Sequence, residues 1–154
     1  MKILIVTEAW KQTNGVSTCY KNIVPILREN GYEITVIYPE LFDTFKIPFY
    51  PEVEMPYKIR QVWFKLQNIK FDHIHIATEG LLGLIARLYC SKYKIPFTTA
   101  YHTNIADYLY KMLKLPTCLS WRYLKWFHNK AKKTLVTTKS MKDDLISFGF
   151  KEDN

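Results

Sequence analysis

The sequence predicts an α/β fold, a doubly wound parallel sheet flanked by helices, and two observations predict it. Short runs of β-branched and aliphatic residues alternate along the chain with longer segments whose apolar residues recur at helical spacing. The 154 residues also match the size of one ordinary domain, so we assign residues 1–154 to a single domain. Strands that alternate with helices imply a parallel sheet joined by right-handed crossovers, which makes the predicted fold Rossmann-like.

The first predicted elements are a buried strand, a helix and a second strand. Residues 3–6 form a continuous aliphatic run, which indicates a buried strand. Apolar residues then recur at helical spacing over residues 16–27, and Gly31 stands where a C-terminal cap belongs. Pro25 would remove a hydrogen bond inside this helix, so we expect a kink or a late helix start there. Residues 34–38 form the second predicted strand.

The middle of the chain breaks the alternation once and then resumes it. Residues 39–57 contain four prolines and are expected to form a long irregular excursion. Residues 59–69 place their apolar side chains on one face of a helix. The third strand covers residues 72–77 and runs into Thr78-Glu79-Gly80 and a helix that reaches Tyr93.

The remaining residues continue the same pattern. They predict a fourth strand at residues 95–101, helices at about 105–113 and about 119–131, a fifth strand at 134–138 and a last helix at 140–148 that ends at Gly149.

Composition indicates an ordinary globular protein with a strong positive charge. Hydrophobic residues make up 48% and charged residues 23%, which excludes intrinsic disorder. The net charge of +8 attracts anions, so nucleic acid, an anionic membrane surface and phosphorylated small molecules all remain candidates. Cys19, Cys90 and Cys118 include no CxxC pair, which argues against a disulfide framework or a zinc site and indicates reduced, mostly buried thiols. With no apolar run of signal-peptide or membrane-spanning length, we expect a cytoplasmic protein, at most peripheral on a membrane.

Ligands of such sheets bind beyond the carboxyl ends of the strands, which directs attention to residues 8–15, 78–80 and 101–104. The first loop has Gly15 alone, without a GxGxxG fingerprint or a Walker lysine, so a dinucleotide bound in the usual Rossmann manner is excluded. Gly15 then has two interpretations. It either serves only the turn, or it lets a ligand phosphate approach the N–H groups at the helix start.

The other two loops carry polar side chains. His102 follows a buried strand, where its imidazole could contact a sugar hydroxyl or a phosphate, although most single histidines are structural. Glu79 stands at the start of a helix, where the helix dipole favours a carboxylate even without a further role. A contact with a ligand hydroxyl is the other interpretation. His73 and His75 share one face of a strand, a spacing that could bind a metal, but no Cys or carboxylate is placed to complete the site, so packing is the better interpretation. The sequence predicts no metal site.

A basic and aromatic segment, residues 111–133, allows three interpretations. It interleaves seven lysine and arginine residues with tryptophan, tyrosine and phenylalanine. The first interpretation is an amphipathic helix with aromatic residues in the core and solvated lysines. The second is a helix at an anionic membrane surface, and the third, ranked last, is stacking on single-stranded nucleic acid.

Four stretches of the sequence, in order and covering nearly the whole chain, resemble glycosyltransferase family 4. The likeness is greatest to GDP-mannose-dependent alpha-mannosyltransferases and sulfoquinovosyl-diacylglycerol synthases. The stretches are Thr7 to Val16, the run Ile74-His75-Ile76-Ala77-Thr78-Glu79-Gly80 with Leu82-Gly83, the run Phe97 to Asn104, and the run Trp121 to Asn129.

The resemblance implies the N-terminal domain of the two-domain GT-B fold, in a retaining and metal-independent transferase that needs no cofactor. The substrates would be a nucleotide-sugar, such as GDP-mannose or a UDP-sugar, and an acceptor. His102 would be the catalytic residue, in contact with the transferred sugar. The substrate-binding residues would be Asn14, Gly15 and Val16, with Gly15 near the donor diphosphate, and Glu79, Gly80, Tyr101, Thr103 and Asn104 on the acceptor side.

The family also implies a donor-binding domain that these residues do not contain. The chain stops at Asn154, before the basic residues and the Glu-x7-Glu pair that hold the donor in the family. We therefore expect little or no activity from these residues alone, and a separate donor-domain polypeptide as one candidate partner. The alternatives are a truncated remnant and a non-catalytic binding module. The charge and the aromatic segment favour a lipid-linked acceptor at a membrane surface.

Overall fold

The computed structural model describes residues 1–47, 50–102 and 116–152 of the chain. They form two compact units, Met1–Phe97 and Thr98–Asn154. The predicted helix at about 105–113, together with Thr103, Asn104, Lys111 and Lys114, lies outside the described residues.

The first unit begins with strand β1 (Lys2–Val6), helix α1 (Gly15–Glu29) and strand β2 (Glu33–Ile37), as the sequence predicts. The helix ends where Gly31 adopts a φ of 83°, and the N–H groups of Gly31 and Tyr32 bond to the carbonyls of Arg28 and Leu27. This is a Schellman cap, which needs a left-handed residue after the helix. The helix runs from Gly15 across Pro25, so of the kink or late helix start expected at this proline the late start was wrong and the kink stays a prediction.

The expected irregular excursion over residues 39–57 was wrong in part. A short 3-10 helix, η1 (Pro39–Leu41), is followed by strands β3 (Thr44–Ile47) and β4 (Tyr50–Pro56), which pair antiparallel with an irregularity between Lys46 and Ile47. The prolines misled the prediction because a two-stranded ribbon has only edge strands, where a residue without an N–H group can be accommodated.

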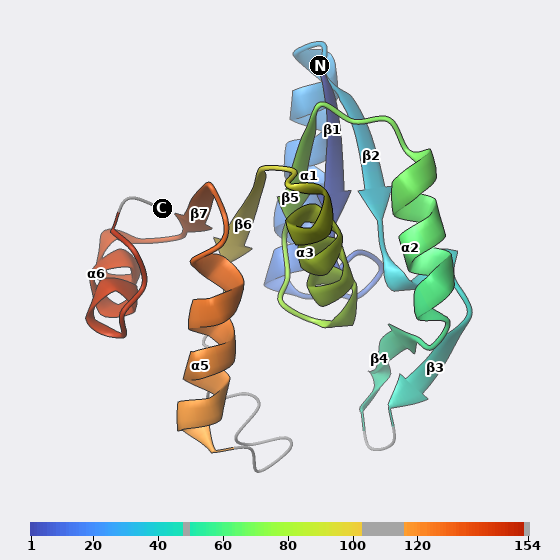
Figure 1. Cartoon of the computed structure of the whole chain (residues 1–154). Coiled ribbons are helices and arrows are strands. Elements are labelled where there is room, and N and C mark those ends of the chain that lie inside the picture. Colours follow the sequence, from blue (N-terminus) through green and yellow to red (C-terminus); the bar gives the residue numbers. More distant parts are fainter. Residues whose placement is uncertain (48–49, 103–115, 153–154) are drawn as a thin grey trace. The chain divides into compact units, whose positions relative to one another are not determined.

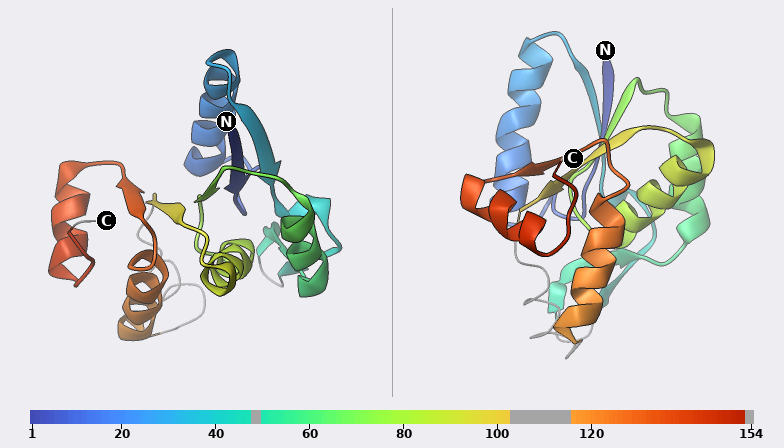
Figure 2. Two further views of the ribbon diagram at one scale, coloured as in Figure 1. Left: turned by 45° about the horizontal axis from the view of Figure 1, so that its top comes forward. Right: turned by 60° about the vertical axis from the view of Figure 1, so that its left-hand side comes forward.

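The rest of the first unit alternates again between helix and strand. It contains helix α2 (Ile59–Asn68), strand β5 (His73–Ile76) and helix α3 (Leu81–Tyr93). Strand β1 pairs in parallel with β2 on one side and with β5 on the other, and Val6 stands opposite both Ile37 and Ile76. Helix α1 covers one face of these strands and helices α2 and α3 cover the other (Figures 1 and 2).

The second unit contains strand β6 (Phe97–Tyr101), helix α5 (Thr117–His128), strand β7 (Lys133–Val136) and helix α6 (Lys139–Ser147). β6 and β7 pair in parallel. Helix α6 ends at Gly149, as predicted, where a φ of 89° again permits a Schellman cap. A buried cluster of Tyr101, Leu124, Leu145 and Phe150 forms the core of this unit.

Within the first unit the strand order is β2-β1-β5 and within the second β6 pairs with β7, all in parallel, so the predicted fold class of parallel strands flanked by helices is confirmed. The chain leaves β1 toward β2 on one side and later returns to β5 on the other. This reversal makes the carboxyl ends of β1 and β5 the topological switch point, where ligands of such sheets bind. Both strands lie within the first unit.

Candidate functional site

The start of helix α1 stands beyond the carboxyl end of β1 and is capped by Asn14. The Asn14 side chain accepts a hydrogen bond from the Ser17 N–H (2.9 Å) and donates one to Gln12 Oε1 (3.0 Å). A side-chain oxygen in this position satisfies one of the free N–H groups of the first helical turn. Both the oxygen and the nitrogen of the Asn14 side chain therefore form hydrogen bonds within the turn. Val16 packs its side chain against the core cluster around Ile5 and Tyr20.

Gly15, the first residue of α1, is glycine for no reason visible in the described residues. Apart from the two adjacent residues and the backbone of α1 itself, none of their atoms would lie within 4 Å of a Cβ added at this position. Its φ is not positive either, since the positive-φ glycines of the described chain are Gly31 and Gly149. Neither a positive φ nor close packing accounts for this glycine, and both interpretations of Gly15 stay predictions.

Glu8 joins the carboxyl ends of β1 and β5, and sequence reasoning did not identify it as a site residue. Its carboxylate accepts hydrogen bonds from the Thr78 hydroxyl and from the Gly83 N–H (3.1 Å), while its own N–H donates to Thr78 Oγ1 (2.9 Å). Burial raises the pKa of the Glu8 carboxyl, and the hydrogen bonds from Thr78, Gly83 and Leu82 lower it by less. The one available signal was a carboxylate two residues beyond a buried strand.

Two glycines of the helix α3 start are required by close approaches. A Cβ on Gly80 would lie 2.6 Å from Glu8 Cδ, and a Cβ on Gly83 would overlap the carbonyl oxygen of Thr78. The run from Thr78 to Gly83 is therefore shaped around the Glu8 carboxylate and the end of β5. Gly80 has φ −74° and ψ −160°, which any residue adopts, so a side chain there is opposed only by crowding against the Glu8 side chain, which would have to move.

Glu79, predicted to line the acceptor side, is only 6% exposed. Its charge is close enough to Tyr20 to contribute to the raised pKa of that phenol, after burial and the Cys19 thiol. The Tyr20 hydroxyl lies 2.7 Å from His75 Nε2 in the interior, which agrees with the prediction that His75 is a packing residue. Glu79 is thus part of a buried polar group beneath the loops at the switch point.

The predicted residues of the fourth strand lie in the second unit. Tyr101 ends β6 and is buried, with its ring edge-on to those of His128 (5.9 Å) and Phe150 (6.4 Å). His128 is itself buried, and its Nδ1 lies 2.9 Å from Thr99 Oγ1, which also bonds to the Thr134 hydroxyl. His102 follows β6 directly and is half-buried. These contacts fix the strand that carries His102.

The described part of the basic and aromatic segment is mainly an amphipathic helix. Leu124 and Phe127 of α5 are buried, and Trp121 stacks on Phe148 with ring centroids 4.1 Å apart. The solvent-facing side keeps Trp126, at 45% exposed, and the exposed Arg122. The first interpretation of this segment accounts for most of its aromatic residues, and one exposed aromatic and cationic strip remains.

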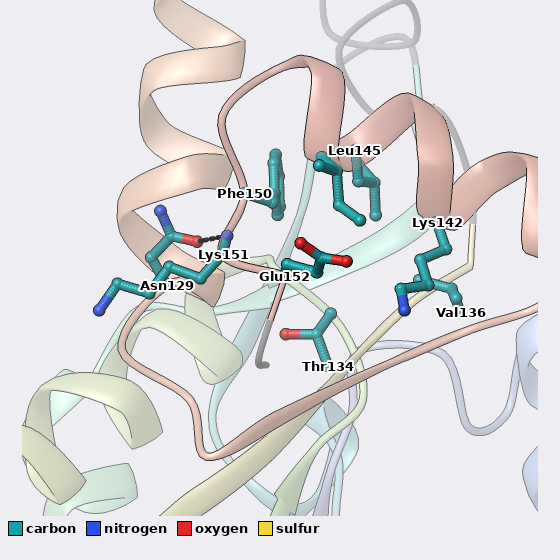
Figure 3. A pocket seen from close by; sticks show the side chains of 9 residues that line it. Asn129, Thr134, Val136, Lys142, Leu145, Phe150, Lys151 and Glu152 are labelled. Carbon is teal, nitrogen blue, oxygen red and sulfur yellow. Dashed lines mark hydrogen bonds between the residues drawn. The ribbon is translucent and has the colours of Figure 1, made fainter.

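A shallow pocket of the second unit lies between α6, β7 and the chain that follows α6 (Figure 3). Asn129 closes one end of it by accepting a hydrogen bond from the Lys151 N–H (3.0 Å). None of the predicted site residues contributes to it. Its lining consists of Asn129, Thr134, Val136, Lys142, Leu145, Ile146, Phe150, Lys151 and Glu152.

Three further features bear on the chemistry. Within residues 1–47, 50–102 and 116–152, no three His, Cys, Asp or Glu side chains are grouped so that they could hold a metal ion. No helix in the described part of the chain is both long and apolar enough to cross a membrane. All three cysteines are free, and Cys118 is exposed and Cys19 partly so, so the expectation of mostly buried thiols holds fully only for Cys90.

The sequence profile of Glycosyltransferase Family 4 matches residues 13–154. A GDP-mannose-dependent alpha-mannosyltransferase of Corynebacterium glutamicum is 25% identical, over 99% of this chain and 41% of the relative. An alpha-monoglucosyldiacylglycerol synthase of Acholeplasma laidlawii is 28% identical, over 95% of this chain and 43% of the relative. A GDP-mannose-dependent alpha-mannosyltransferase of Mycobacterium tuberculosis is 22% identical, over 97% of this chain and 45% of the relative. The chain spans less than half the length of these curated relatives.

Proposed function

This chain belongs to glycosyltransferase family 4, and from that premise we propose that it is the acceptor-side half of a retaining, metal-independent hexosyltransferase. The enzyme transfers a hexose, mannose in the first instance, from a nucleotide-sugar to a lipid or glycan acceptor. The likeness to mannosyltransferases that depend on GDP-mannose supports this choice of donor. A donor-binding domain outside these residues completes the site.

The observation that carries the proposal is the open space at Gly15. Apart from the adjacent residues and the backbone of α1, no atom of the described residues would lie within 4 Å of a Cβ on Gly15, and its φ is not positive, so a ligand group has room to approach here. The position is the first residue of a 15-residue helix, where N–H groups and the helix dipole favour an anion. The donor diphosphate is the anion of this reaction, so Gly15 is where it approaches the chain.

The second helix start at the switch point does not compete for the diphosphate. Glu8 already places a carboxylate on the Gly83 N–H at the start of α3. A diphosphate there would have to displace the Glu8 carboxyl group, whereas the start of α1 holds no acidic residue in its first turn. Charge on the leaving diphosphate is then stabilised by the α1 amides together with the donor half. His102 takes the position beside the transferred sugar.

The experiment is release of GDP or UDP from the matching nucleotide-sugars, measured for this chain alone and for its mixture with the donor half of a family member. Turnover is expected only in the mixture, and His102→Ala is expected to abolish it. A His102→Ala mixture as active as the unmodified one would remove His102 from the reaction. A well-folded chain without turnover in either condition would instead indicate a non-catalytic binding module.

The acceptor in this proposal is lipid-linked and is met at an anionic membrane surface. Trp126 and Arg122 on the exposed side of α5, the net charge of +8 and the likeness to a glucosyldiacylglycerol synthase support it. Co-sedimentation with liposomes at low salt should be stronger for anionic than for neutral vesicles, and weaker for Trp126→Ala. Equal sedimentation with both kinds of vesicle would argue for a water-soluble acceptor.

A further inference from the structure

Glu8 occupies the place at the switch point where an open sheet of this kind receives its ligand. It lies beyond the carboxyl end of β1, and its side chain reaches across to the loop that follows β5. One carboxylate oxygen bonds to the Thr78 hydroxyl and the other to the Gly83 N–H in the first turn of α3. In other proteins such helix starts bind phosphate, and here the Glu8 carboxyl group of the chain itself occupies this position.

The neighbouring residues are fitted to this carboxylate. Gly80 lacks a Cβ because one would lie 2.6 Å from Glu8 Cδ, 2.7 Å from Oε1 and 3.0 Å from Cγ. The Glu8 N–H donates to the same Thr78 oxygen whose proton goes to the Glu8 carboxylate, so residues 8 and 78 are joined by a reciprocal pair of hydrogen bonds. Glu79 is held between these two fixed residues, Thr78 and Gly80.

We propose that Glu8 is a positioning residue, whose carboxylate fixes the Thr78–Gly83 turn and thereby sets where Glu79 stands at the acceptor side. The part of this inference that concerns the acceptor rests on the proposed function. Glu8 does not act on the substrate itself, because both of its carboxylate oxygens are already engaged by the chain.

A double-mutant cycle tests the fit between Glu8 and Gly80 without reference to activity. In urea unfolding of the full chain, Gly80→Ala should raise the unfolding constant about tenfold or more, because the added methyl group displaces the Glu8 side chain. In a Glu8→Ala background, which removes all three crowding atoms, the same change should cost less than about threefold. In a Glu8→Gln background those atoms remain and the full cost should return. Equal costs of Gly80→Ala in all three backgrounds would overturn the proposed fit.

Hydrogen exchange provides a second readout that needs only the conservative variant. In Glu8→Gln the Gly83 amide should exchange about tenfold faster, while amides in the last turns of α3 keep their rates, because only the charged partner of the helix start is lost. Glu33→Gln is a matched control, since Glu33 is an exposed carboxylate paired with Lys2 on the amino side of the sheet. Unchanged exchange at Gly83, or an equal rise along all of α3, would contradict a local positioning role.

Kinetics then test the consequence for the acceptor. In the reconstituted mixture with dioctanoylglycerol as acceptor, Glu8→Gln should raise the acceptor KM about tenfold and leave the donor KM within about twofold, because a shifted Thr78–Gly83 turn alters the acceptor side and not the donor side. An unchanged acceptor KM would overturn the link to Glu79. Absence of turnover in the unmodified mixture would count against the proposed function, and the unfolding and exchange results would still decide the role of Glu8.

Discussion

Replacement of Gly15 by alanine should separate the ligand role of this residue from its structural role. The methyl group enters open space at the first position of α1, where φ is not positive. Alanine is the better helix former by about 1 kcal/mol in helix interiors, and it also reduces the entropy of the unfolded chain. Gly15→Ala should therefore leave the free energy of unfolding unchanged or raise it by up to about 1 kcal/mol.

The same methyl group should be costly to catalysis. If a diphosphate approaches the α1 amides at this position, a Cβ displaces it by roughly 1 Å, and a misplacement of that size can reduce the rate up to about a hundredfold. We expect the donor kcat/KM of the reconstituted mixture to fall about tenfold to a hundredfold, which corresponds to about 1.4–2.7 kcal/mol of lost transition-state stabilisation.

Gly31→Ala is the matched control because its expected pattern is the reverse. Gly31 also has no atom of the described residues within 4 Å of an added Cβ, but its φ is 83°, which alanine tolerates poorly. This variant should lose about 1 kcal/mol of stability and keep its donor kcat/KM. The ligand interpretation is refuted if Gly15→Ala keeps full activity, and the open-space observation is refuted if it destabilises the chain as Gly31→Ala does.

Three further predictions concern buried titratable groups. Burial raises the pKa of Glu8 above its ordinary 4.5, so the folded chain holds this proton to a higher pH than the unfolded chain. As pH rises above 4.5, the free energy of unfolding of the unmodified chain in urea should therefore fall relative to that of Glu8→Gln. A relative rise would contradict this assignment. Tyr20→Phe removes the hydrogen bond to His75 and should cost about 1–3 kcal/mol in urea unfolding, whereas a loss below about 0.5 kcal/mol would show that the pair contributes little. Burial raises the pKa of the Cys90 thiol to about 12, so iodoacetamide should label Cys118 rapidly and Cys90 only after unfolding, and early labelling of Cys90 would show that the interior opens locally.

The elements that periodicity predicts well are those that pack against the sheet. The aliphatic run at residues 3–6 and the helical spacing after Gly15 indicate which residues are buried. This pattern can be seen within a single segment of the sequence. The β3–β4 ribbon was not predicted, although its two strands are neighbours in sequence and Thr44 pairs with Pro56. Its prolines locally resemble those of a loop.

The candidate site was predicted only as far as single loops can indicate it. The sequence points to Gly15 and Glu79 because each stands beyond a predicted strand. It does not point to Glu8, whose role depends on Thr78, 70 residues away in the chain. Nor does it show that Glu79 is buried beside Tyr20, since that depends on how α1 packs over β5.

We propose that these residues form half of an enzyme that transfers a sugar rather than only releasing a nucleotide. The most direct measurement follows radiolabelled mannose from GDP-mannose, in the mixture of this chain with a donor half, into a diacylglycerol or glycan acceptor. We expect label in the acceptor fraction with both halves present, and none with either half alone or with His102→Ala. Two results would contradict the proposal that these residues form half of a sugar transferase. One is nucleotide release with all of the label left as free mannose, and the other is equal transfer of label without this chain.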